Sequence, residues 1–328
     1  MPQRLHPGKM IVDASIIIPT YNRLWSLPDA IASCPRDTGT EIIVVDDGST
    51  DGTWEWLATQ PGLRAIRQAN WGKPAAANAG FEAARGCYVR FLDSDDLLIP
   101  DAARAQLAHA LAEQPDICVA GYVARYEDGG REELHDWIDC GDFLAQQLGE
   151  CDSSHYSAYL FRRDFLAGIR HRPEYRFRDD RMFVLECALR GPRVATWRRP
   201  TLVHRHHDRG RIQFQPGSTL IVTNWQELEM WKKIAALLDA DGELTDRRRA
   251  AMANNVWPLA LRIAARSRRE GHDAVDWLRR LAPSFRIPHH GIQNRLYRRL
   301  GYGVAQPVAN IVLTLRNAVR GAAAMVRR

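Results

Sequence analysis

Apolar positions in the first half of the chain alternate between short continuous runs and segments with helical spacing. Residues 15–19 and 41–45 are mostly β-branched runs that end in polar, turn-forming residues, as buried parallel strands do. Residues 74–85 have helical spacing, with proline in the first turn and Gly86 just past the end. The same reading gives helices at 24–33, 53–58 and 100–113 and strands at 63–67, 88–92 and 117–125. This alternation predicts an α/β domain on a mostly parallel, Rossmann-type sheet with helices on both faces.

The pattern changes beyond residue 125. Residues 139–207 mix short helices and strands, and beyond about residue 216 the apolar spacing is helical throughout, with helices at 219–238 and 247–265. We therefore expect three parts, namely an N-terminal tail at 1–13, an α/β domain at 14–216 and a C-terminal helical region at 217–328.

The composition is that of a folded globular chain. Of its 328 residues, 45% are hydrophobic, which is enough for a sizeable core and excludes a disordered protein. The six cysteines form no Cys-x-x-Cys pair, so we predict reduced, mostly buried thiols. The opening residues lack the apolar segment of a signal peptide, and no run reaches the roughly 18 apolar residues of a membrane span. A cytoplasmic location is therefore expected.

The net charge of +6 is unevenly distributed. From Trp277 to Arg328 there are ten arginines and no carboxylate side chain, which favours an anionic partner. Apolar side chains of this tail fall on one helical face, at Val308, Ile311, Val312, Leu315, Val319, Ala322 and Val326. Such a basic amphipathic helix is predicted either to lie on the inner face of the cell membrane or to pack against protein. Nucleic acid is not expected, because no aromatic side chains are interleaved for base stacking.

Three polar clusters follow predicted strands, at residues 20–23, 46–49 and 93–96. In open α/β sheets, ligands bind beyond the carboxyl ends of the strands. Asp93 and Asp95 have the spacing with which two carboxylates converge on a hard divalent cation shared with phosphate oxygens. A carboxylate of the second cluster can accept a hydrogen bond from a nucleobase. Each cluster alone is also compatible with a solvated turn, so the agreement of all three carries the prediction.

Four strings occur in order along the first 125 residues. They are Ser-Ile-Ile-Ile-Pro-Thr-Tyr-Asn at 15–22, Val-Val-Asp-Asp-Gly-Ser-Thr-Asp at 44–51, Asn-Ala-Gly at 78–80 and Phe-Leu-Asp-Ser-Asp-Asp at 91–96. Together they closely resemble family 2 glycosyltransferases with the GT-A fold. The resemblance implies a UDP- or GDP-linked sugar donor, Mn²⁺ or Mg²⁺, and inversion at the anomeric carbon. It also implies a nucleotide-sugar-binding half at 14–125, an acceptor-binding half at 126–216, and a glycan or lipid-linked acceptor in cell-surface polysaccharide synthesis.

The resemblance also assigns roles to individual residues. Asp95 would bind the metal that bridges the diphosphate, with Asp93 beside it facing the ribose or sugar. An exposed lysine before a helix is the simpler account of Lys73, and a phosphate or sugar contact is the functional one. The complete set of implied donor-binding residues is Pro19, Tyr21, Asp46, Asp47, Lys73, Asn78, Asp93 and His207.

A catalytic base is expected in an acidic pair that opens a helix. An acceptor hydroxyl is a poor nucleophile until a positioned carboxylate takes its proton. Asp179 and Asp180 open the predicted helix at 179–189, and we assign Asp180 as the base with Asp179 as its neighbour. The family's usual pair is Glu-Asp, so this departure leaves open which carboxylate is the base. Both can alternatively serve only to stabilise the helix dipole.

The segment 203–208 contains three histidines and resembles the family's late segment, which approaches the diphosphate. An imidazole there would complete the metal shell or a cation would neutralise the leaving group. On a strand, His204 and His206 face one side and His207 the other, and no cysteine spacing accompanies them, so zinc is not predicted. His155 and Tyr156 are expected either to line the acceptor cleft or to pack at the core edge.

Other classes of enzyme and binding protein fit the sequence less well. A P-loop would need glycine at 67 and Ser or Thr at 74, where the chain has Arg67 and Pro74. No Gly-x-Gly-x-x-Gly follows the first strand, and Gly-x-Ser-x-Gly is absent. A metal-dependent sugar nucleotidyltransferase is disfavoured because its Gly-rich phosphate loop is missing. A non-catalytic nucleotide-sugar-binding protein is disfavoured because carboxylates occupy all the matched positions.

Overall fold

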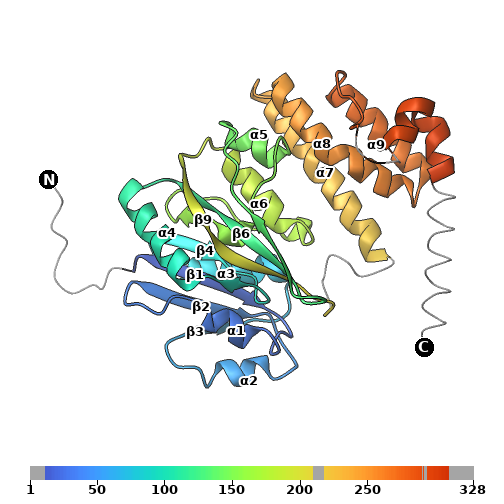
Figure 1. Cartoon of the computed structure of the whole chain (residues 1–328). Helices are drawn as coiled ribbons and strands as arrows, with labels where there is room; N and C mark the ends of the chain where they lie inside the picture. The colour runs from blue at the N-terminus through green and yellow to red at the C-terminus, as the bar shows by residue number, and fades with distance from the viewer. Residues whose placement is uncertain (1–11, 210–217, 290, 292–293, 310–328) are drawn as a thin grey trace. The chain divides into compact units, whose positions relative to one another are not determined.

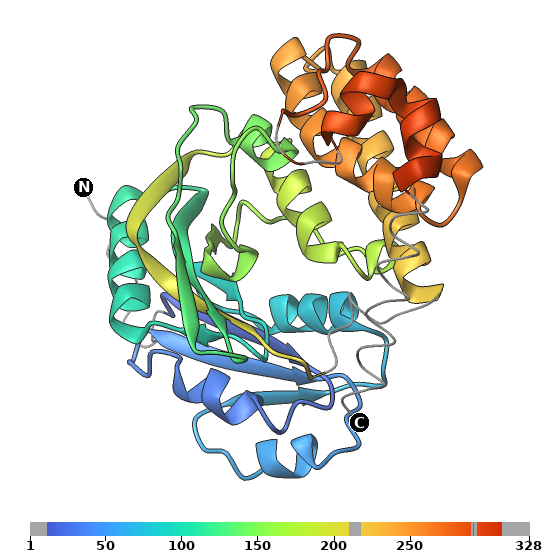
Figure 2. The same ribbon diagram turned by 45° about the vertical axis from the view of Figure 1, so that its right-hand side comes forward.

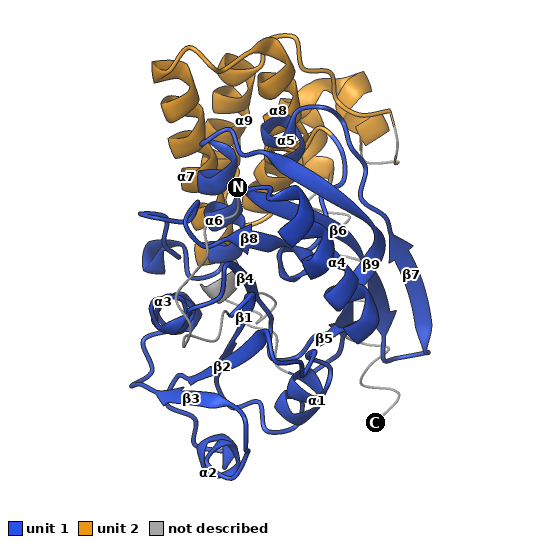
Figure 3. Ribbon diagram, turned by 90° about the vertical axis from the view of Figure 1, so that its left-hand side faces the viewer, with its two compact units in different colours: residues 1–147, 151–214 blue, residues 148–150, 215–328 orange. Residues whose placement is uncertain are grey.

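The computed structural model describes residues 12–209, 218–289, 291 and 294–309, without the side chains of residues 218–221 (Figure 1). The chain divides into two compact units, shown in different colours in Figure 3. The first unit comprises Met1–Gln147 and Cys151–Phe214, and the second comprises Leu148–Glu150 and Gln215–Arg328.

The first unit is built on one sheet whose strand order is β3-β2-β1-β4-β8-β6-β9-β5, with β7 paired to β6 (Figure 3). The strands are β1 (Ala14–Thr20), β2 (Thr40–Asp46), β3 (Arg64–Arg67), β4 (Tyr88–Phe91), β5 (Leu97–Leu98), β6 (Ile117–Tyr126), β7 (Arg131–His135), β8 (Leu160–Arg162) and β9 (Val194–His206). The α/β fold predicted from the sequence is confirmed.

The parallel part of the sheet is smaller than the sequence pattern predicts. Strands β3, β2, β1 and β4 run parallel to one another, and β9 runs parallel to β6. Strand β8, however, lies antiparallel between β4 and β6. Strand β5 pairs antiparallel with β9, and β7 pairs antiparallel with β6. The regular alternation of one strand with one helix ends at β4. Strand β7, for example, follows β6 after a short turn and therefore pairs antiparallel with it.

Helices cover both faces of this sheet. In Figure 2, α1 and α2 lie below the blue strands and α3 lies above them. The chain moves from β1 to β2 and β3 in one direction and then returns past β1 to β4. Because such crossovers are right-handed, the two directions place their helices on opposite faces of the sheet. The helices of the first unit are α1 (Leu27–Ala32), α2 (Thr53–Leu57), α3 (Lys73–Ala83), α4 (Pro100–Glu113), α5 (Phe143–Leu148) and α6 (Asp179–Ala188), with short 3₁₀ turns η1 (Tyr156–Ala158) and η2 (Pro173–Tyr175).

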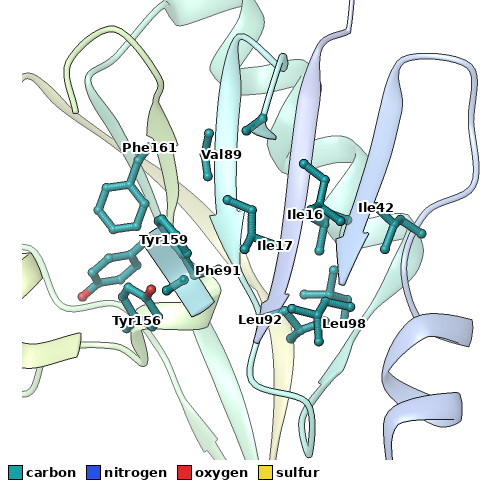
Figure 4. Packing of buried hydrophobic residues seen from close by; sticks show 14 of the residues in the cluster. Ile16, Ile17, Ile42, Val89, Phe91, Leu92, Leu98, Tyr156, Tyr159 and Phe161 are labelled. Atoms are coloured by element: carbon teal, nitrogen blue, oxygen red, sulfur yellow. The ribbon is translucent and has the colours of Figure 1, made fainter. Parts of the chain in front are cut away.

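The core lies on both sides of the central strands. Ile16 and Ile17 on β1 and Ile42 on β2 are buried, as expected for strands with helices above and below (Figure 4). Helix α3 packs closely on β1 because Gly80 has no side chain, and a Cβ there would clash with Ile17 Cγ2. This close packing fixes α3 beside the carboxyl ends of β1 and β2.

The second unit is helical in its described residues. It contains α7 (Ser218–Ala240), α8 (Asp246–Ala264), α9 (Arg268–Leu281) and a further helical stretch at 294–309. The buried Trp257 ring contacts the Tyr297 ring with centroids 5.3 Å apart, which joins α8 to that stretch. None of the helices in the described ranges is both long and apolar enough to cross a bilayer. Beyond Val308 and Ala309, the predicted amphipathic tail lies outside the described residues.

Candidate active site

The carboxylate of Asp47 holds the loop that leads into α3. It accepts hydrogen bonds from Gln68 Nε2 at 2.7 Å, from the Trp71 amide at 2.9 Å and from the Gly72 amide at 2.8 Å. Gly72 has φ +92°, a left-handed backbone that favours glycine. Asp47, which the sequence assigned to the nucleoside, therefore has its oxygens engaged by this loop and positions Lys73 at the start of α3.

The ends of β1 and β2 present two buried oxygen atoms without hydrogen-bond partners among the described residues. Thr20 and Asp46 are paired across the strands, and Thr20 Oγ1 and Asp46 Oδ2 both lack a hydrogen bond. Asp46 Oδ1 accepts from the Ser49 amide at 3.2 Å, and Arg67 Nε lies 3.5 Å from Oδ2. Since a buried oxygen without a donor is costly, this edge is suited to a ligand that supplies one.

Two further predicted donor-binding residues, Pro19 and Tyr21, differ in accessibility. Pro19 is buried within β1, so a ligand at the strand end would contact neighbouring residues rather than the proline ring. Tyr21 lies just beyond the strand and is 43% exposed, so its ring is accessible at the same edge. Of the two, Tyr21 is the one whose side chain can stack on a ligand.

Lys73 lies near both Asp93, in the cluster at 93–96, and the acidic pair that opens α6. Its Nζ lies 2.7 Å from Asp93 Oδ1. Burial alone would lower the pKa of Lys73, but the charges of Asp93, Asp179 and Asp180 outweigh burial and raise that pKa. The ammonium group therefore stays charged among carboxylates that lie more than 80 residues apart in the sequence. The simpler account of Lys73, an exposed lysine, is wrong, because its side chain is 26% exposed and ion-paired.

Asp93 depends on this lysine for its charge. Burial would raise the pKa of Asp93, but the neighbouring Lys73 ammonium lowers it instead. Asp93 is therefore a carboxylate paired with a cation.

Asp95 faces a different set of partners at the end of the same loop. His207 Nε2 lies 3.1 Å from Asp95 Oδ2, and an Arg23 guanidinium nitrogen lies 3.6 Å from the same oxygen. Burial would raise the pKa of Asp95, but the hydrogen bond from His207 and the charge of Arg23 lower it. The His207 ring packs edge-on against Trp25, with centroids 4.8 Å apart, so its direction is fixed.

The spacing of Asp95 and His207 suits a divalent cation. Two ligand atoms at right angles around an ion, each at roughly 2.1 Å, are about 3 Å apart. The separation of 3.1 Å between His207 Nε2 and Asp95 Oδ2 matches that value. One carboxylate oxygen and one imidazole nitrogen are also a donor set that Mn²⁺ accepts.

At the start of α6, the two predicted catalytic carboxylates have different environments. Asp179 is buried, and its Oδ2 lies 3.0 Å from His171 Nδ1. The other ring nitrogen of His171 lies 2.8 Å from the Tyr156 hydroxyl. Both ring nitrogens of His171 thus have a hydrogen-bond partner, Tyr156 at Nε2 and Asp179 at Nδ1. Asp180 is only half-buried, so it is the carboxylate of the pair that a substrate can reach.

Asn78 supports this network from α3. Its side-chain nitrogen donates to the His171 carbonyl and its side-chain oxygen accepts from the His171 amide, both at 2.9 Å. Asn78, which the sequence assigned to the donor, therefore uses both atoms of its side-chain amide to position His171. His171 itself was missed, because it belongs to no recognisable motif and its role depends on residues from α3, η1 and α6.

A second histidine cluster lies next to Asp95. His204 Nδ1 is 3.0 Å from both oxygens of the buried Asp96, and His155 Nδ1 is 4.0 Å from one of them. Burial and the nearby His204 lower the pKa of His155 to about 4, so its ring is neutral at pH 7. These three residues could hold a metal ion by proximity, but Asp96 also accepts from the Arg205 amide at 3.0 Å. The cluster thus fastens the loop after β4 to β9.

Comparisons with known proteins indicate a family for the α/β unit. Residues 15–170 match the profile described as Glycosyl transferase family 2. The chain is 31% identical over 153 residues to the putative glycosyltransferase EpsH of Bacillus subtilis, covering 45% of this chain and 42% of EpsH. It is 30% identical over 202 residues to the uncharacterized glycosyltransferase EpsJ of the same organism, covering 56% of this chain and 58% of EpsJ. The chain thus spans about half the length of these relatives.

The fold is similar to that of S. aureus TarS 1-349, a structure described in complex with UDP-GlcNAc. The TM-score is 0.59 at 18% identity, covering 83% of this chain and 82% of TarS 1-349. A second structure of TarS 1-349 gives a TM-score of 0.56 at 17% identity, covering 94% of this chain and 92% of that one. At this identity the likeness concerns the fold. Residues 15–170 therefore match glycosyltransferase family 2, and the chain has the GT-A fold.

Proposed function

We propose that the protein transfers a sugar from a UDP- or GDP-linked donor to an acceptor hydroxyl, with inversion at the anomeric carbon. The observation that carries the proposal is the gathering of Asp93, Asp179 and Asp180 around the Lys73 ammonium group. The match to family 2 and the donor named in the TarS structure support a nucleotide-sugar as substrate.

The donor nucleoside would bind at the ends of β1 and β2. Thr20 Oγ1 and Asp46 Oδ2 are acceptors without partners among the described residues, and uracil and guanine both carry ring N–H donors. The exposed Tyr21 ring would stack on the base. The diphosphate would then extend towards Lys73 and Arg23, whose positive charges favour a leaving group that gains negative charge.

Asp95 and His207 would hold a divalent ion at the diphosphate, with Asp93 beside them. When bound, Mn²⁺ or Mg²⁺ would supply Lewis-acid stabilisation of the departing nucleoside diphosphate. The protein's own part is to hold the two ligand atoms close together, and an ion would take the place of the proton that lies between them in the hydrogen bond. The lowered pKa of Asp95 keeps it ionised, and packing against Trp25 orients the His207 ring.

Asp180 would act as the general base. As the acceptor oxygen bonds to the anomeric carbon, the bond from that carbon to the diphosphate oxygen breaks, and Asp180 takes the hydroxyl proton. Asp179 would orient this end of α6 through its hydrogen bond to His171. The greater exposure of Asp180 favours it over Asp179 for this role.

A growing glycan is the acceptor class that the relatives suggest. The chain is 40% identical over 100 residues to the chondroitin synthase of Escherichia coli, covering 29% of this chain and 15% of that enzyme. We propose action in cell-surface polysaccharide synthesis on the cytoplasmic side. The basic tail, with ten arginines and no carboxylate after Trp277, would bring the enzyme to a lipid-linked acceptor at the membrane.

The proposal is tested by nucleotide release from a panel of nucleotide-diphosphate sugars, with Mn²⁺ or with a chelator. We expect release from a uridine- or guanosine-linked donor only with the metal, and a product of inverted anomeric configuration by NMR. A retained configuration would exclude single displacement. Formation of nucleotide-sugar from sugar phosphate and nucleoside triphosphate would instead identify a nucleotidyltransferase.

A further inference from the structure

Two cysteines outside the proposed catalytic residues lie in direct contact. Cys140 precedes α5 and Cys151 follows it, and their Sγ atoms are 3.1 Å apart. Both side chains are half-buried and both are thiols in this structure. The two residues are 11 positions apart, so their contact reflects the fold of the segment between them.

Hydrogen bonds that involve neither sulfur atom bring the two ends of this segment together. The buried side chain of Gln146 donates from Nε2 to the Ile138 carbonyl at 2.6 Å and to the Asp152 carbonyl at 3.0 Å. Asp142 Oδ1 accepts from the Ala145 amide at 2.9 Å at the start of α5. Because these bonds hold the backbone before and after α5, the thiols stay close without a covalent link.

The remaining cysteines differ from this pair. Burial raises the pKa of Cys34 to about 12 and that of Cys118 to about 11, and it also raises the pKa of Cys187 well above its ordinary value. Thiols that stay protonated and enclosed are poor nucleophiles. Cys87 is exposed and has no second cysteine beside it in its strand-end position, so it can react only with an external thiol or disulfide.

We propose that Cys140 and Cys151 are a disulfide-forming pair, oxidised by a low-molecular-weight disulfide such as glutathione disulfide. One thiolate attacks the glutathione disulfide and releases a glutathione thiol. The second thiolate then attacks the mixed disulfide and releases the other. One protein disulfide forms, one glutathione disulfide is reduced, and the two protein thiol protons end on the two glutathione thiols.

The bond would act on the loop that leads to the α6 end of the site. Residues 151–155 run directly into η1, where Tyr156 bonds His171. Arg181 on α6 donates to Ser153 Oγ at 3.2 Å and to the Gln147 carbonyl at 2.5 Å. Closing the ring from Cys140 to Cys151 restricts the loop whose residues these hydrogen bonds use.

The test treats the intact chain with graded glutathione disulfide, blocks remaining thiols with N-ethylmaleimide and digests with trypsin. No lysine or arginine lies between Arg131 and Arg162, so both cysteines fall in the peptide 132–162, while Cys87 falls in 86–90. We expect the first peptide to be unlabelled and lighter by two hydrogens, at a concentration at least about 10-fold below that which adds glutathione to Cys87.

Two variants separate ring closure from ordinary thiol reactivity. Cys151→Ser should leave Cys140 to form a glutathione adduct, whereas Cys87→Ser should form the internal disulfide as the wild type does. Glutathione adducts on both cysteines of the wild type would overturn the proposal. Full maleimide labelling of the 132–162 peptide at concentrations that modify Cys87 would overturn it as well.

Discussion

At the scale of single residues, the site is organised around the ammonium group of Lys73. Asp93 lies 2.7 Å from it, and the charges of Asp179 and Asp180 help to raise its pKa. The attraction between this ammonium group and the surrounding carboxylates raises the Lys73 pKa, so the cation stays charged in the site.

Asp180→Asn removes the proposed proton acceptor without changing the size of the side chain. We expect the turnover rate to fall by about 10²–10⁴-fold, while donor affinity stays within about twofold, because the acceptor's proton has nowhere to go. Transfer kinetics and calorimetric donor titration measure the two quantities. Asp164→Asn, an exposed residue with the same charge change, serves as the control and should match wild type. An unchanged turnover rate in Asp180→Asn would remove Asp180 from the mechanism.

Tyr156→Phe tests the buried network behind Asp179. Loss of the hydroxyl leaves His171 Nε2 without its 2.8 Å partner, so the free energy of unfolding should fall by about 1 kcal/mol. Tyr126→Phe is the matched control, since its hydroxyl reaches only the more exposed Glu133, and should cost less than about 0.5 kcal/mol. Urea denaturation measures both, and equal losses in the two variants would show that the network contributes nothing special.

At the scale of elements, α3 connects the parts of the site. Asp47 fixes the loop before it, Lys73 starts it, and Asn78 in its second turn holds His171. The helix can do this because Gly80 lets it approach β1 closely.

Gly80→Ala should disturb that packing. The added methyl group would collide with Ile17 Cγ2 and would lie 3.3 Å from Val45 Cγ2, in the buried layer between α3 and the strands. We expect the free energy of unfolding to fall by about 1–3 kcal/mol, although alanine alone favours helix by roughly 1 kcal/mol. The exposed Glu82→Ala on the same helix should change stability by less than about 0.5 kcal/mol. The midpoints of denaturant unfolding measure both changes in stability. A Gly80→Ala variant more stable than the wild type would mean that α3 is loosely packed against the strands.

The individual helices and strands also show how much of the fold could be predicted from the sequence. Continuous apolar runs gave β1 and β2, and helical spacing gave α3, α4 and α6 to within a few residues, because these signals are local. The antiparallel insertion of β8 between β4 and β6 was not predictable, since β8 has only three residues and its pairing is decided by distant strands. His171 and Asp96 were missed as site-building residues for the same reason. Their partners come from other elements, and no spacing in the chain records such contacts.

At the scale of the whole molecule, the chain combines an α/β unit with a helical one, and the division is not a single cut. Residues 148–150 belong with the helical unit, where Asn254 donates to the Gly149 carbonyl at 3.0 Å and Asn255 to the Leu148 carbonyl at 2.8 Å. The change of pattern near residue 216 lies close to the division at Phe214, but these three residues carry no local signal of their membership. Hydrogen bonds from side chains about 100 residues away attach residues 148–150 to the helical unit.

The central claim is that Asp95, with His207, binds a divalent ion that a nucleotide donor shares. Calorimetric titration of UDP and GDP into the wild type and Asp95→Ala, each with Mn²⁺ and with EDTA, tests it most directly. We predict that the wild type binds one of the nucleotides at least about 10-fold more tightly with Mn²⁺, and that Asp95→Ala binds weakly in both conditions. Wild-type affinity that is unchanged by EDTA, or Mn²⁺-dependent affinity that survives in Asp95→Ala, would contradict the account.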